Sequence, residues 1–214
     1  MKTKIYFIIL ILFSFVTSCQ DDNNNDADDI VKDIDGNIYK TVTIGSQTWM
    51  VENLKTTRYL NGDLIGTTNP PTKNISGESS PKYQWAYGGD ENNVATYGRL
   101  YTWFAITDKR KIAPKGWHIP TSQDWKILED FLGGRDIAAE KLKESNENGF
   151  AALPGGYYSN YGYFYHLGTV GFWWSYTEQP KQSDWYYLLT YKCGPVAFIG
   201  DYRNLALSVR CIKD

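Results

Sequence analysis

The C-terminal part of the chain alternates turn residues with aromatic runs, and this pattern limits the folds open to it. From Gly155 onward, Gly, Ser and Asn separate short runs of Tyr, Phe and Trp. Near the end, Leu205, Leu207, Val209 and Cys211 take every second position and alternate with Ala206, Ser208 and Arg210. Because successive side chains of a strand point to opposite faces, this alternation is typical of a strand with one buried face. We therefore predict an antiparallel sheet in this half of the chain.

The clearest helix signal lies in the middle of the chain. Thr121 and Asp124 form the Thr-x-x-Asp pattern of a capping box. Apolar residues then recur at helical spacing: Trp125, Leu128 and Leu132. Gly133 and Gly134 end this helix, and a second short helix is predicted over 137–144.

The N-terminal part of the folded region predicts a hairpin followed by loops. β-branched residues lie on both sides of an Asp-Gly-Asn turn at 35–37. The stretch 56–95 is rich in Asn, Gly, Pro and Ser, which favours long surface loops. Together with the helices and the C-terminal sheet, these features predict an α+β fold of antiparallel sheets, one or two helices and long loops.

The first 18 residues have the pattern of a secretory signal. Lys2 and Lys4 precede an apolar run over 5–16, and small residues then lead to Cys19. The run is shorter than the roughly 20 residues that span a membrane. Cys19 after Val-Thr-Ser resembles the lipobox of bacterial lipoproteins, which implies a signal peptide over 1–18 and acylation of Cys19. The alternative is an ordinary cleaved signal followed by a chance cysteine.

After Cys19, residues 20–29 contain Asp, Asn, Gln, one Ala and no large apolar residue. Such a segment cannot bury enough surface to offset its ordering entropy, so we predict an acidic disordered tether over 19–29. Its start resembles the export tag of Bacteroidetes lipoproteins, which implies a bacterial outer-membrane protein exposed at the cell surface. The lipid anchor would be its only contact with the membrane. Residues 30–214 have the size of one domain with a core of its own.

The charge of the mature chain argues against nucleic-acid binding. Loss of residues 1–18 removes two lysines and no acid, which leaves 20 basic and 24 acidic residues and a formal charge of −4. Nucleic-acid binding requires a basic patch, and we expect none on this acidic chain. The sequence does not determine the oligomeric state.

Several phrases, in their order, resemble one bacterial family. They are Asp33-Ile-Asp-Gly-Asn-Ile-Tyr-Lys-Thr-Val, Ile44-Gly-Ser-Gln-Thr-Trp-Met-Val-Glu-Asn-Leu, Tyr97-Gly-Arg-Leu-Tyr-Thr-Trp, Gly116-Trp-His-Ile-Pro-Thr, Leu153-Pro-Gly-Gly-Tyr, Trp173-Trp-Ser and Ser208-Val-Arg-Cys. The family is the Fibrobacter succinogenes major paralogous domain, and the resemblance covers nearly the whole mature chain. The phrase at 116–121 and the closing phrase are also similar to C-type-lectin-like and sulfatase-modifying-factor folds. The resemblance therefore implies a C-type-lectin-like fold for residues 30–214.

The same resemblance bears on the cysteines. Members of the family often carry a cysteine just before the Pro of the Gly-Trp-His segment, expected to pair with the cysteine of the last strand. Here that position is Ala113, which leaves Cys193 as the other cysteine of the folded body. If 192–195 is a turn and the final strand runs beside the strand that follows it, Cys193 and Cys211 lie close enough for a disulfide. The alternative is one buried and one surface thiol.

Catalytic motifs are lacking in the sequence. The histidines, His118 and His166, lie far apart and outside any His-Glu-x-x-His pattern, and no Gly-x-Ser-x-Gly elbow occurs. We interpret His118 as structural. A glycosidase needs only two carboxylates, so a hydrolase is the least favoured interpretation, and we expect no catalytic residue.

Two short stretches resemble parts of calcium sites. Residues 33–37 (Asp-Ile-Asp-Gly-Asn) resemble the start of a calcium loop without its spacing or distal Glu, so a plain Asp-Gly turn is favoured. Residues 178–180 (Glu-Gln-Pro) lack the Trp-Asn-Asp triplet that accompanies a lectin calcium motif. We therefore expect no metal site and no cofactor, with calcium as the one ion to test.

Aromatic residues are concentrated from 157 to 191, far above the chain average of 16%. Aromatic rings stack on the apolar faces of sugars, while carboxylates and amides bind the hydroxyl groups. We assign Trp173 and Trp174 to the core, because strands bury every second residue. The ligand-binding candidates are residues expected in loops: Tyr157, Tyr158, Tyr161, Asp184, Trp185, Asp201, Tyr202 and Arg203.

These observations predict a surface lipoprotein with a non-catalytic domain that binds an extracellular glycan or polysaccharide. The alternative is an adhesive or structural protein that binds another protein in a surface complex. Exposed, coplanar aromatic rings would favour sugar, whereas a large flat apolar patch would favour a protein partner.

Overall fold

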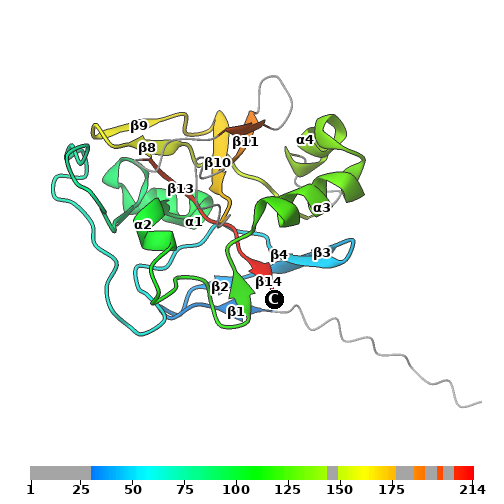
Figure 1. Ribbon diagram of the computed structural model, residues 1–214, viewed down its shortest axis with the longest axis horizontal. Helices are drawn as coiled ribbons and strands as arrows, with labels where there is room; N and C mark the ends of the chain where they lie inside the picture. Colours follow the sequence, from blue (N-terminus) through cyan, green and yellow to red (C-terminus); the bar gives the residue numbers. More distant parts are fainter. Residues whose placement is uncertain (1–29, 144–148, 177–185, 191–196, 200–204) are drawn as a thin grey trace, which may run out of the picture.

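The computed structural model describes residues 30–143, 149–176, 186–190, 197–199 and 205–214. Its strands form three sheets, and short helices pack beside them (Figure 1). This arrangement confirms the predicted α+β class. In the described part of the chain, no helix has both the length and the apolar character needed to cross a membrane.

The chain opens with the predicted β-hairpin. Strands β1 (Val31–Lys32) and β2 (Ile38–Tyr39) pair antiparallel. The Asp33 carboxylate closes the turn, because it accepts hydrogen bonds from two backbone N–H groups of the turn and from the Tyr39 hydroxyl. Val31 and Tyr39 are buried in the main core, so this hairpin belongs to the same body as the rest of the domain.

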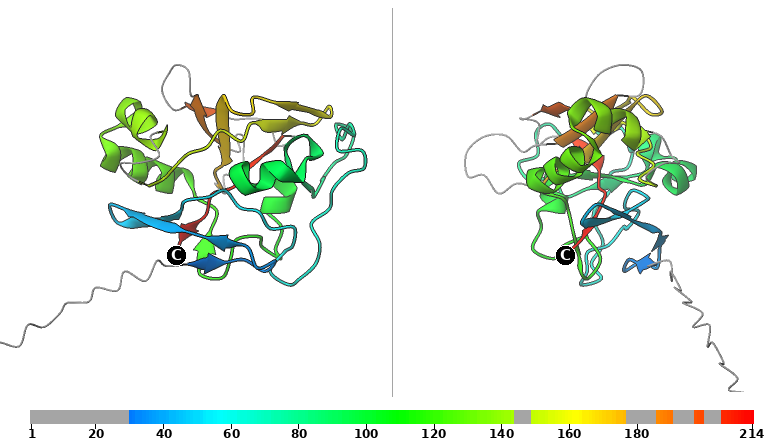
Figure 2. Two further views of the ribbon diagram at one scale, coloured as in Figure 1. Left: turned by 180° about the vertical axis from the view of Figure 1, so that it is seen from behind. Right: turned by 90° about the vertical axis from the view of Figure 1, so that its right-hand side faces the viewer.

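A four-stranded antiparallel sheet follows in the order β3-β4-β14-β7. Its members come from three distant parts of the chain: β3 (Thr41–Ile44), β4 (Gln47–Met50), β7 (Trp117–His118) and β14 (Ile212–Lys213). The C-terminal strand therefore lies between the β3–β4 hairpin and the strand that leads into helix α3, as Figure 2 shows from behind.

The largest sheet has eight strands, with the path β12-β11-β10-β13-β6-β5, and the β8–β9 hairpin joins it through β13. Its strands are β5 (Gln84–Trp85), β6 (Leu100–Thr102), β8 (Tyr157–Ser159), β9 (Tyr163–Tyr165), β10 (Val170–Trp174), β11 (Tyr186–Thr190), β12 (Ala197–Ile199) and β13 (Ala206–Ser208). Every pair is antiparallel except β10 with β13. The predicted antiparallel C-terminal sheet is thus confirmed apart from that one parallel pair.

Two longer helices pack together at one end of the molecule, α3 (Ser122–Leu132) and α4 (Arg135–Lys143) (Figure 1). The predicted capping box is present. The Thr121 hydroxyl accepts a hydrogen bond from the backbone N–H of Asp124, and the Asp124 carboxylate accepts one from the backbone N–H of Thr121. Gly133 ends α3 in the left-handed conformation, as predicted. Helix α4 begins two residues earlier than the sequence indicated.

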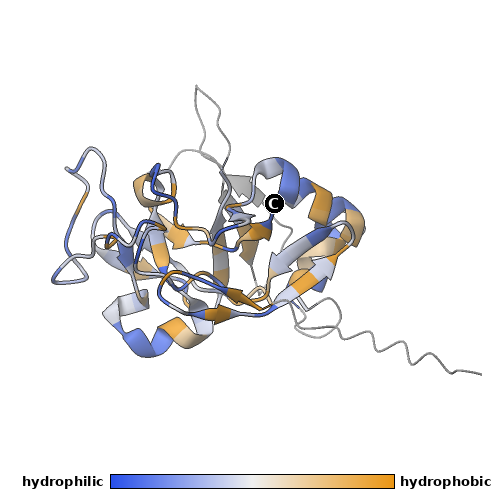
Figure 3. Ribbon diagram, turned by 90° about the horizontal axis from the view of Figure 1, so that it is seen from below, coloured by the Kyte–Doolittle hydropathy of each residue, from blue (hydrophilic) through white to orange (hydrophobic). Residues whose placement is uncertain are grey.

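Shorter helical turns connect the strands of the large sheet. They are η1 (Tyr87–Gly89), η2 (Glu91–Asn93), α1 (Val94–Tyr97) and α2 (Trp103–Ile106). Figure 3 shows hydrophilic and hydrophobic residues side by side along the helical ribbons. Helix α2 is an exception, because it consists of Trp-Phe-Ala-Ile. The predicted loop over 56–95 is irregular only as far as 83, because 84–95 forms β5, η1, η2 and the start of α1. The segment also buries apolar residues that fix its course: Tyr59, Ile65, Ile75 and Trp85.

Three apolar clusters fill the interior. One lies between α3, α4, the β3–β4 hairpin and the strands β10 and β11, where the rings of Trp125 and Tyr187 stack 4.1 Å apart. A second and larger one includes Met50, Tyr101 and Trp174, and a third stacks Trp85 on Tyr158. Trp173 and Trp174 are both buried, which confirms their assignment to the core.

A buried polar cluster, the Asn53–Arg210 cluster, joins these parts. The Asn53 side-chain oxygen accepts hydrogen bonds from Arg210 Nε at 3.1 Å and Nη2 at 2.8 Å, and from Trp173 Nε1 at 2.8 Å. Its side-chain nitrogen donates to the Tyr97 carbonyl at 2.8 Å. Arg210 is only 1% exposed and also donates to the carbonyl oxygen of Phe150. The cluster therefore ties together five segments that are remote in sequence.

The end of the chain departs from the single strand predicted for it. Leu207, Val209 and Cys211 do share one core, as their alternation indicated. However, β13 belongs to the large sheet and β14 to the four-stranded sheet, and Arg210 lies between them. The residues between the apolar positions are buried as well, because the chain passes from one sheet to the other through the interior.

The Asn53–Arg210 cluster yields a prediction about stability. Asn53→Ala would remove the side-chain oxygen that accepts hydrogen bonds from both Arg210 and the Trp173 N–H. The loss of an acceptor for buried donors lowers the stability of the folded state. We expect a loss of about 3 kcal/mol in the free energy of unfolding, measured by urea denaturation. Asn92→Ala, which removes an exposed amide bonded to neighbouring Asp90, should cost less than about 0.5 kcal/mol. Equal losses in the two variants would contradict the role assigned to the cluster.

Candidate functional site: an exposed tyrosine face

The β8–β9 hairpin carries the aromatic residues that the structure leaves open to solvent. Its register pairs Tyr157 with Tyr165, Tyr158 with Phe164 and Ser159 with Tyr163. Since strand side chains alternate between faces, Tyr157, Tyr163 and Tyr165 share one face, and Tyr158 and Phe164 share the other. Figure 1 shows this hairpin along one edge of the molecule.

The outward side forms a continuous aromatic surface, here called the tyrosine face (Tyr157, Tyr163, Tyr165 and His166). Tyr163 is 60% exposed and Tyr165 is 42% exposed. The ring of Tyr165 lies 6.2 Å from that of Tyr163, 5.4 Å from that of Tyr157 and 6.3 Å from that of His166. Phe172 supports the face from β10, with its ring 5.1 Å from that of Tyr157. The rings are therefore held against one another from the inside while their outer sides remain accessible.

The inward side corrects one predicted ligand-binding residue. Tyr158 is fully buried, and its ring stacks on Trp85 at 4.3 Å and contacts Phe164 at 4.9 Å. Its hydroxyl donates to the carbonyl oxygen of Lys73, and burial raises the pKa of this hydroxyl to about 12. Tyr158 was expected in a loop, but it lies in β8 with its side chain toward the core, so it cannot contact a ligand in this fold.

Backbone contacts fix the hairpin to the irregular segment before β5. The N–H of Ile75 donates to the carbonyl oxygen of Asn160 at 2.8 Å. Gly162, with a φ of +93°, turns so close to Thr72 that a Cβ would lie 2.1 Å from the Thr72 carbonyl oxygen. The turn of the hairpin therefore requires glycine at this position. The tyrosine face is consequently presented by a rigid support.

Of the other predicted binding residues, the structure describes two. Tyr161 lies in the β8–β9 turn and is 62% exposed, so it is accessible to a ligand. Tyr157 is half-buried at the base of the face. Five further candidates lie outside the described residues, and their placement stays a prediction: Asp184, Trp185, Asp201, Tyr202 and Arg203.

Three members of the face, Tyr163, Tyr165 and His166, were not among the sequence candidates. The signal that could have found them is the strict alternation in Tyr-Phe-Tyr at 163–165 after an Asn-Tyr-Gly turn. That pattern places two tyrosines on one side of a strand. The sequence could not show which side faced solvent, because both sides carry aromatic residues.

The face offers aromatic stacking and hydroxyl groups. Burial raises the pKa of the Tyr157 hydroxyl, so this group stays protonated at neutral pH and can donate a hydrogen bond. Ring faces and hydroxyls at this spacing suit an uncharged ligand with apolar surfaces and polar edges. Tyr163 and Tyr165 contribute the accessible rings, and Ser159 lies opposite Tyr163 on the same side.

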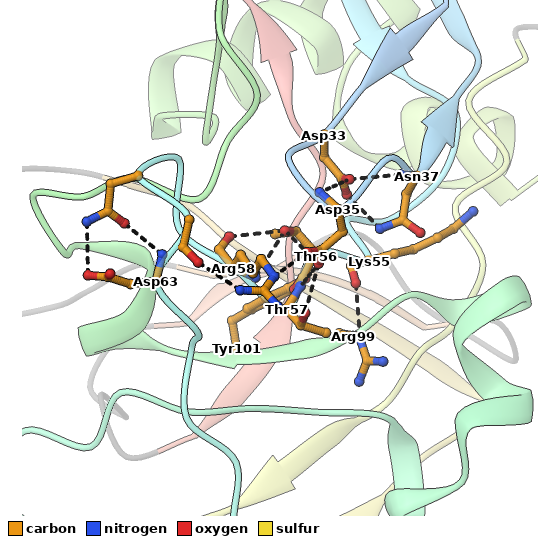
Figure 4. Close-up of polar contacts among 12 residues, drawn as sticks. Asp33, Asp35, Asn37, Lys55, Thr56, Thr57, Arg58, Asp63, Arg99 and Tyr101 are labelled. Carbon is orange, nitrogen blue, oxygen red and sulfur yellow. Dashed lines mark hydrogen bonds and ion pairs between the residues drawn. The ribbon is translucent and has the colours of Figure 1, made fainter.

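The calcium-like stretch at 33–37 uses its carboxylates within the protein. Asp33 binds turn N–H groups and the Asn37 side chain. Asp35 accepts from the Thr57 hydroxyl at 2.8 Å and pairs with Arg58 Nε at 3.2 Å. Figure 4 shows both carboxylates directed at these partners. Across the described ranges, no group of three or more His, Cys, Asp or Glu side chains could hold a metal ion.

The cysteine predictions are resolved only in part. The side chain of Cys211 is fully buried, and burial raises the pKa of its thiol. The topology assumed for a Cys193–Cys211 bond is wrong, because β13 pairs with β10, β6 and β8 and not with β12. Cys193 itself lies outside the described residues, as does Cys19, so the disulfide and the lipidation stay predictions.

His118 joins two carboxylates at the start of helix α3. Its Nδ1 lies 2.8 Å from Asp214 Oδ1, and its Nε2 lies 3.4 Å from Asp124 Oδ2. The hydrogen bond to Asp124 raises the pKa of His118, with a further contribution from Asp214. Burial alone would raise the pKa of Asp124, but hydrogen bonds from His118 and Thr121 lower it to about 2. The imidazole therefore connects the C-terminal strand with the capped end of the helix.

The family model for the Fibrobacter succinogenes major domain matches residues 42–213. The chain belongs to this family. No curated protein and no solved structure matches the chain. The phrases that resemble the family supply the core of the domain: Asn53, Tyr97, Trp173 and Arg210 all take part in the Asn53–Arg210 cluster. The tyrosine face, by contrast, lies almost entirely outside these phrases, with Tyr157 as its one residue inside them.

The correction at Tyr158 can be tested by stability. Tyr158→Ala removes a buried ring that stacks on Trp85, so we expect a loss of about 3–5 kcal/mol in the free energy of unfolding. Tyr163→Ala removes an exposed ring and should change it by less than about 1 kcal/mol. Thermal or urea unfolding of both variants measures the difference. A stable Tyr158→Ala protein would show that this side chain is not part of the core.

The His118 contacts predict a pH-dependent contribution. Because the folded pKa of His118 is raised above the unfolded value of about 6.5, its stabilisation is fully present below that value. It is lost as the pH rises through the folded pKa. His118→Gln should thus lower the free energy of unfolding at pH 5.5 by up to about 1 kcal/mol, since the pair is partly exposed, and by less at pH 9. The same loss at both pH values would contradict this assignment.

Proposed function

We propose that this protein is a bacterial surface lipoprotein whose domain binds an extracellular glycan without chemistry, through the tyrosine face. The observation that carries the proposal is the exposure of Tyr163 and Tyr165, 60% and 42%, on one side of a rigid strand. The rings of Tyr163 and Tyr165 lie 6.2 Å apart and are inclined by 44°, so they are not coplanar and each offers its own face for stacking on a sugar ring.

The arrangement favours a binding role because its parts are pre-ordered. Phe172 behind the face and the Thr72–Gly162 contact beside it hold the hairpin in one conformation, so little ordering entropy would be lost on binding. The tyrosines offer hydroxyl groups that donate and accept hydrogen bonds at the edge of each ring. The carboxylates of the calcium-like turn are occupied by the protein, so we propose binding that needs no calcium ion.

The proposal also includes the type of fold and the cellular location of the protein. The antiparallel sheets and the Trp-His-Ile-Pro-Thr segment leading into α3 support a C-type-lectin-like architecture. The signal-like start, the cysteine at position 19 and the acidic tract after it support a lipid-anchored protein on the outer face of the bacterial outer membrane. A surface position would bring the domain into contact with extracellular polysaccharides.

A second function, recognition of another protein, is favoured by one observation. Helices α3 and α4 expose large apolar side chains close together, with Phe131 at 62%, Ile137 at 53% and Ile127 at 37%. Ile127 and Phe131 stand one helical turn apart on α3 and so lie on the same side. Such a group is a candidate contact surface for a protein partner.

The experiment is a binding screen against neutral polysaccharides with the chain from Gln20 to Asp214, which retains every buried core residue. Tyr163→Ala and Tyr165→Ala should each weaken saturable binding by about three- to tenfold, because each removes a stacking ring. Phe131→Ala is the matched control, an equally exposed aromatic on α3, and should leave the affinity unchanged.

The two functions give opposite results in this screen. Binding should also survive a chelator. If no neutral glycan binds the folded protein, or if both tyrosine variants bind as well as the parent chain, the glycan proposal fails. A protein partner captured by the parent chain and lost in Phe131→Ala would then support the second function.

A further inference from the structure

Three hollows follow one another over a surface away from the tyrosine face. The first, about 540 Å³, and the second, about 320 Å³, share Thr107, Asp108 and Lys109 in their walls. The second and the third, about 230 Å³, share Trp117. Because neighbours share walls, the hollows form one elongated groove, here called the lysine groove, that runs from the loop after α2 to the end of β1.

Lysine ammonium groups line this groove from distant parts of the sequence. Lys109 and Lys111 border the second hollow, and Lys32, Lys115 and Lys213 border the third. All five are exposed. Among the described residues, no side chain forms a hydrogen bond or ion pair with the ammonium of Lys32, Lys109, Lys111 or Lys115. The groove therefore carries positive charge that the described protein does not neutralise.

The carboxylates near the groove are already engaged. Asp108 has a side chain only 4% exposed and is paired with Arg110 at 2.9 Å and Lys82 at 2.8 Å. Asp214 lies against His118. The Asp108 contacts neutralise the charges of Arg110 and Lys82, not the charges of the lysines that border the second and third hollows. The electrostatic potential in these two hollows therefore stays positive.

The groove also has features that a flat basic surface lacks. The half-buried Trp117 stands between the second and third hollows and presents an aromatic wall to both. The second hollow adds apolar walls from Ile106 and Ile112. The hydroxyls of Thr107 and Thr121 in its lining already donate to the Trp103 carbonyl oxygen and to the Asp124 carboxylate. Its volume is that of a small-molecule pocket. An aromatic wall and ammonium groups along one groove suit a polymer whose units have a ring with an apolar face and an acidic group.

We propose that the lysine groove is a second binding site, specific for acidic polysaccharides whose sugar carboxylates pair with its lysines while a ring stacks on Trp117. A membrane of anionic lipids would contact the outermost lysines and leave the hollows unfilled. Single-stranded nucleic acid would need several exposed rings for successive bases, whereas the Phe104, Trp117 and Tyr176 side chains that line the hollows are all half-buried. The proposal concerns a different face from the tyrosine face, so either can fail without the other.

The test measures binding of tetragalacturonate by calorimetry with the chain from Gln20 to Asp214. The fully methyl-esterified tetrasaccharide is the uncharged control ligand, because it has the same sugar rings without the carboxylate charges. We expect at least tenfold tighter binding of the acid form at low salt, with an affinity that falls as salt rises. The double variant Lys109→Gln/Lys115→Gln should weaken the acid form about fivefold or more.

Two control variants separate this site from the other one. Lys126→Gln removes an exposed lysine on α3 that pairs with Asp130, and it should leave the affinity unchanged. Tyr163→Ala should also leave it unchanged. Equal binding of acid and ester forms, or no effect of the double variant, would overturn the proposal. So would tighter binding to vesicles containing 30% phosphatidylglycerol or to a single-stranded DNA 12-mer than to the acid form.

Discussion

The burial of Arg210 is the constraint on which the rest of the structure depends. A guanidinium that is 1% exposed must be surrounded by acceptors, since an uncompensated buried charge costs several kcal/mol. The Asn53 oxygen and the Phe150 carbonyl supply acceptors, and the Phe150 ring lies 4.6 Å from the guanidinium carbon. Because Asn53 also receives the Trp173 N–H and donates to the Tyr97 carbonyl, one polar cluster fixes the relative positions of both larger sheets. Gly98 permits this approach, since a Cβ there would lie 2.6 Å from the Asn53 Cβ.

This organisation explains why the family phrases say little about a ligand. Asn53, Tyr97, Trp173 and Arg210 come from four separate phrases of the sequence, yet they meet in the interior and define the scaffold. The two surfaces proposed as binding sites relate differently to these phrases. The tyrosine face on β8–β9 lies almost entirely outside them, whereas the lysine groove is built around Trp117, which lies inside the phrase at 116–121.

The sequence predicted those elements whose signals are local. The opening hairpin, the capped helix α3 and the burial of Trp173 follow from turn chemistry, a capping box and strand alternation, and all three are present. The prediction that Tyr158 binds a ligand was wrong. Aromatic residues occur on both sides of β8–β9, and only tertiary packing decides which side is buried. The sequence also did not predict the lysine groove. The run Lys109-Arg110-Lys111 is a local basic signal, but no local pattern shows that Lys32 and Lys213 come to lie beside it in the fold.

The central claim is that the core is a fixed support and that the exposed rings of β8–β9 bind a neutral glycan. An NMR titration of the labelled protein with a neutral oligosaccharide tests it most directly. The account predicts saturable shifts of the amides of Tyr163, Tyr165 and His166, while the indole N–H of Trp173 and the Nε–H of Arg210 stay unchanged. Shifts that avoid the hairpin, or that spread through the Asn53–Arg210 cluster, would contradict the account.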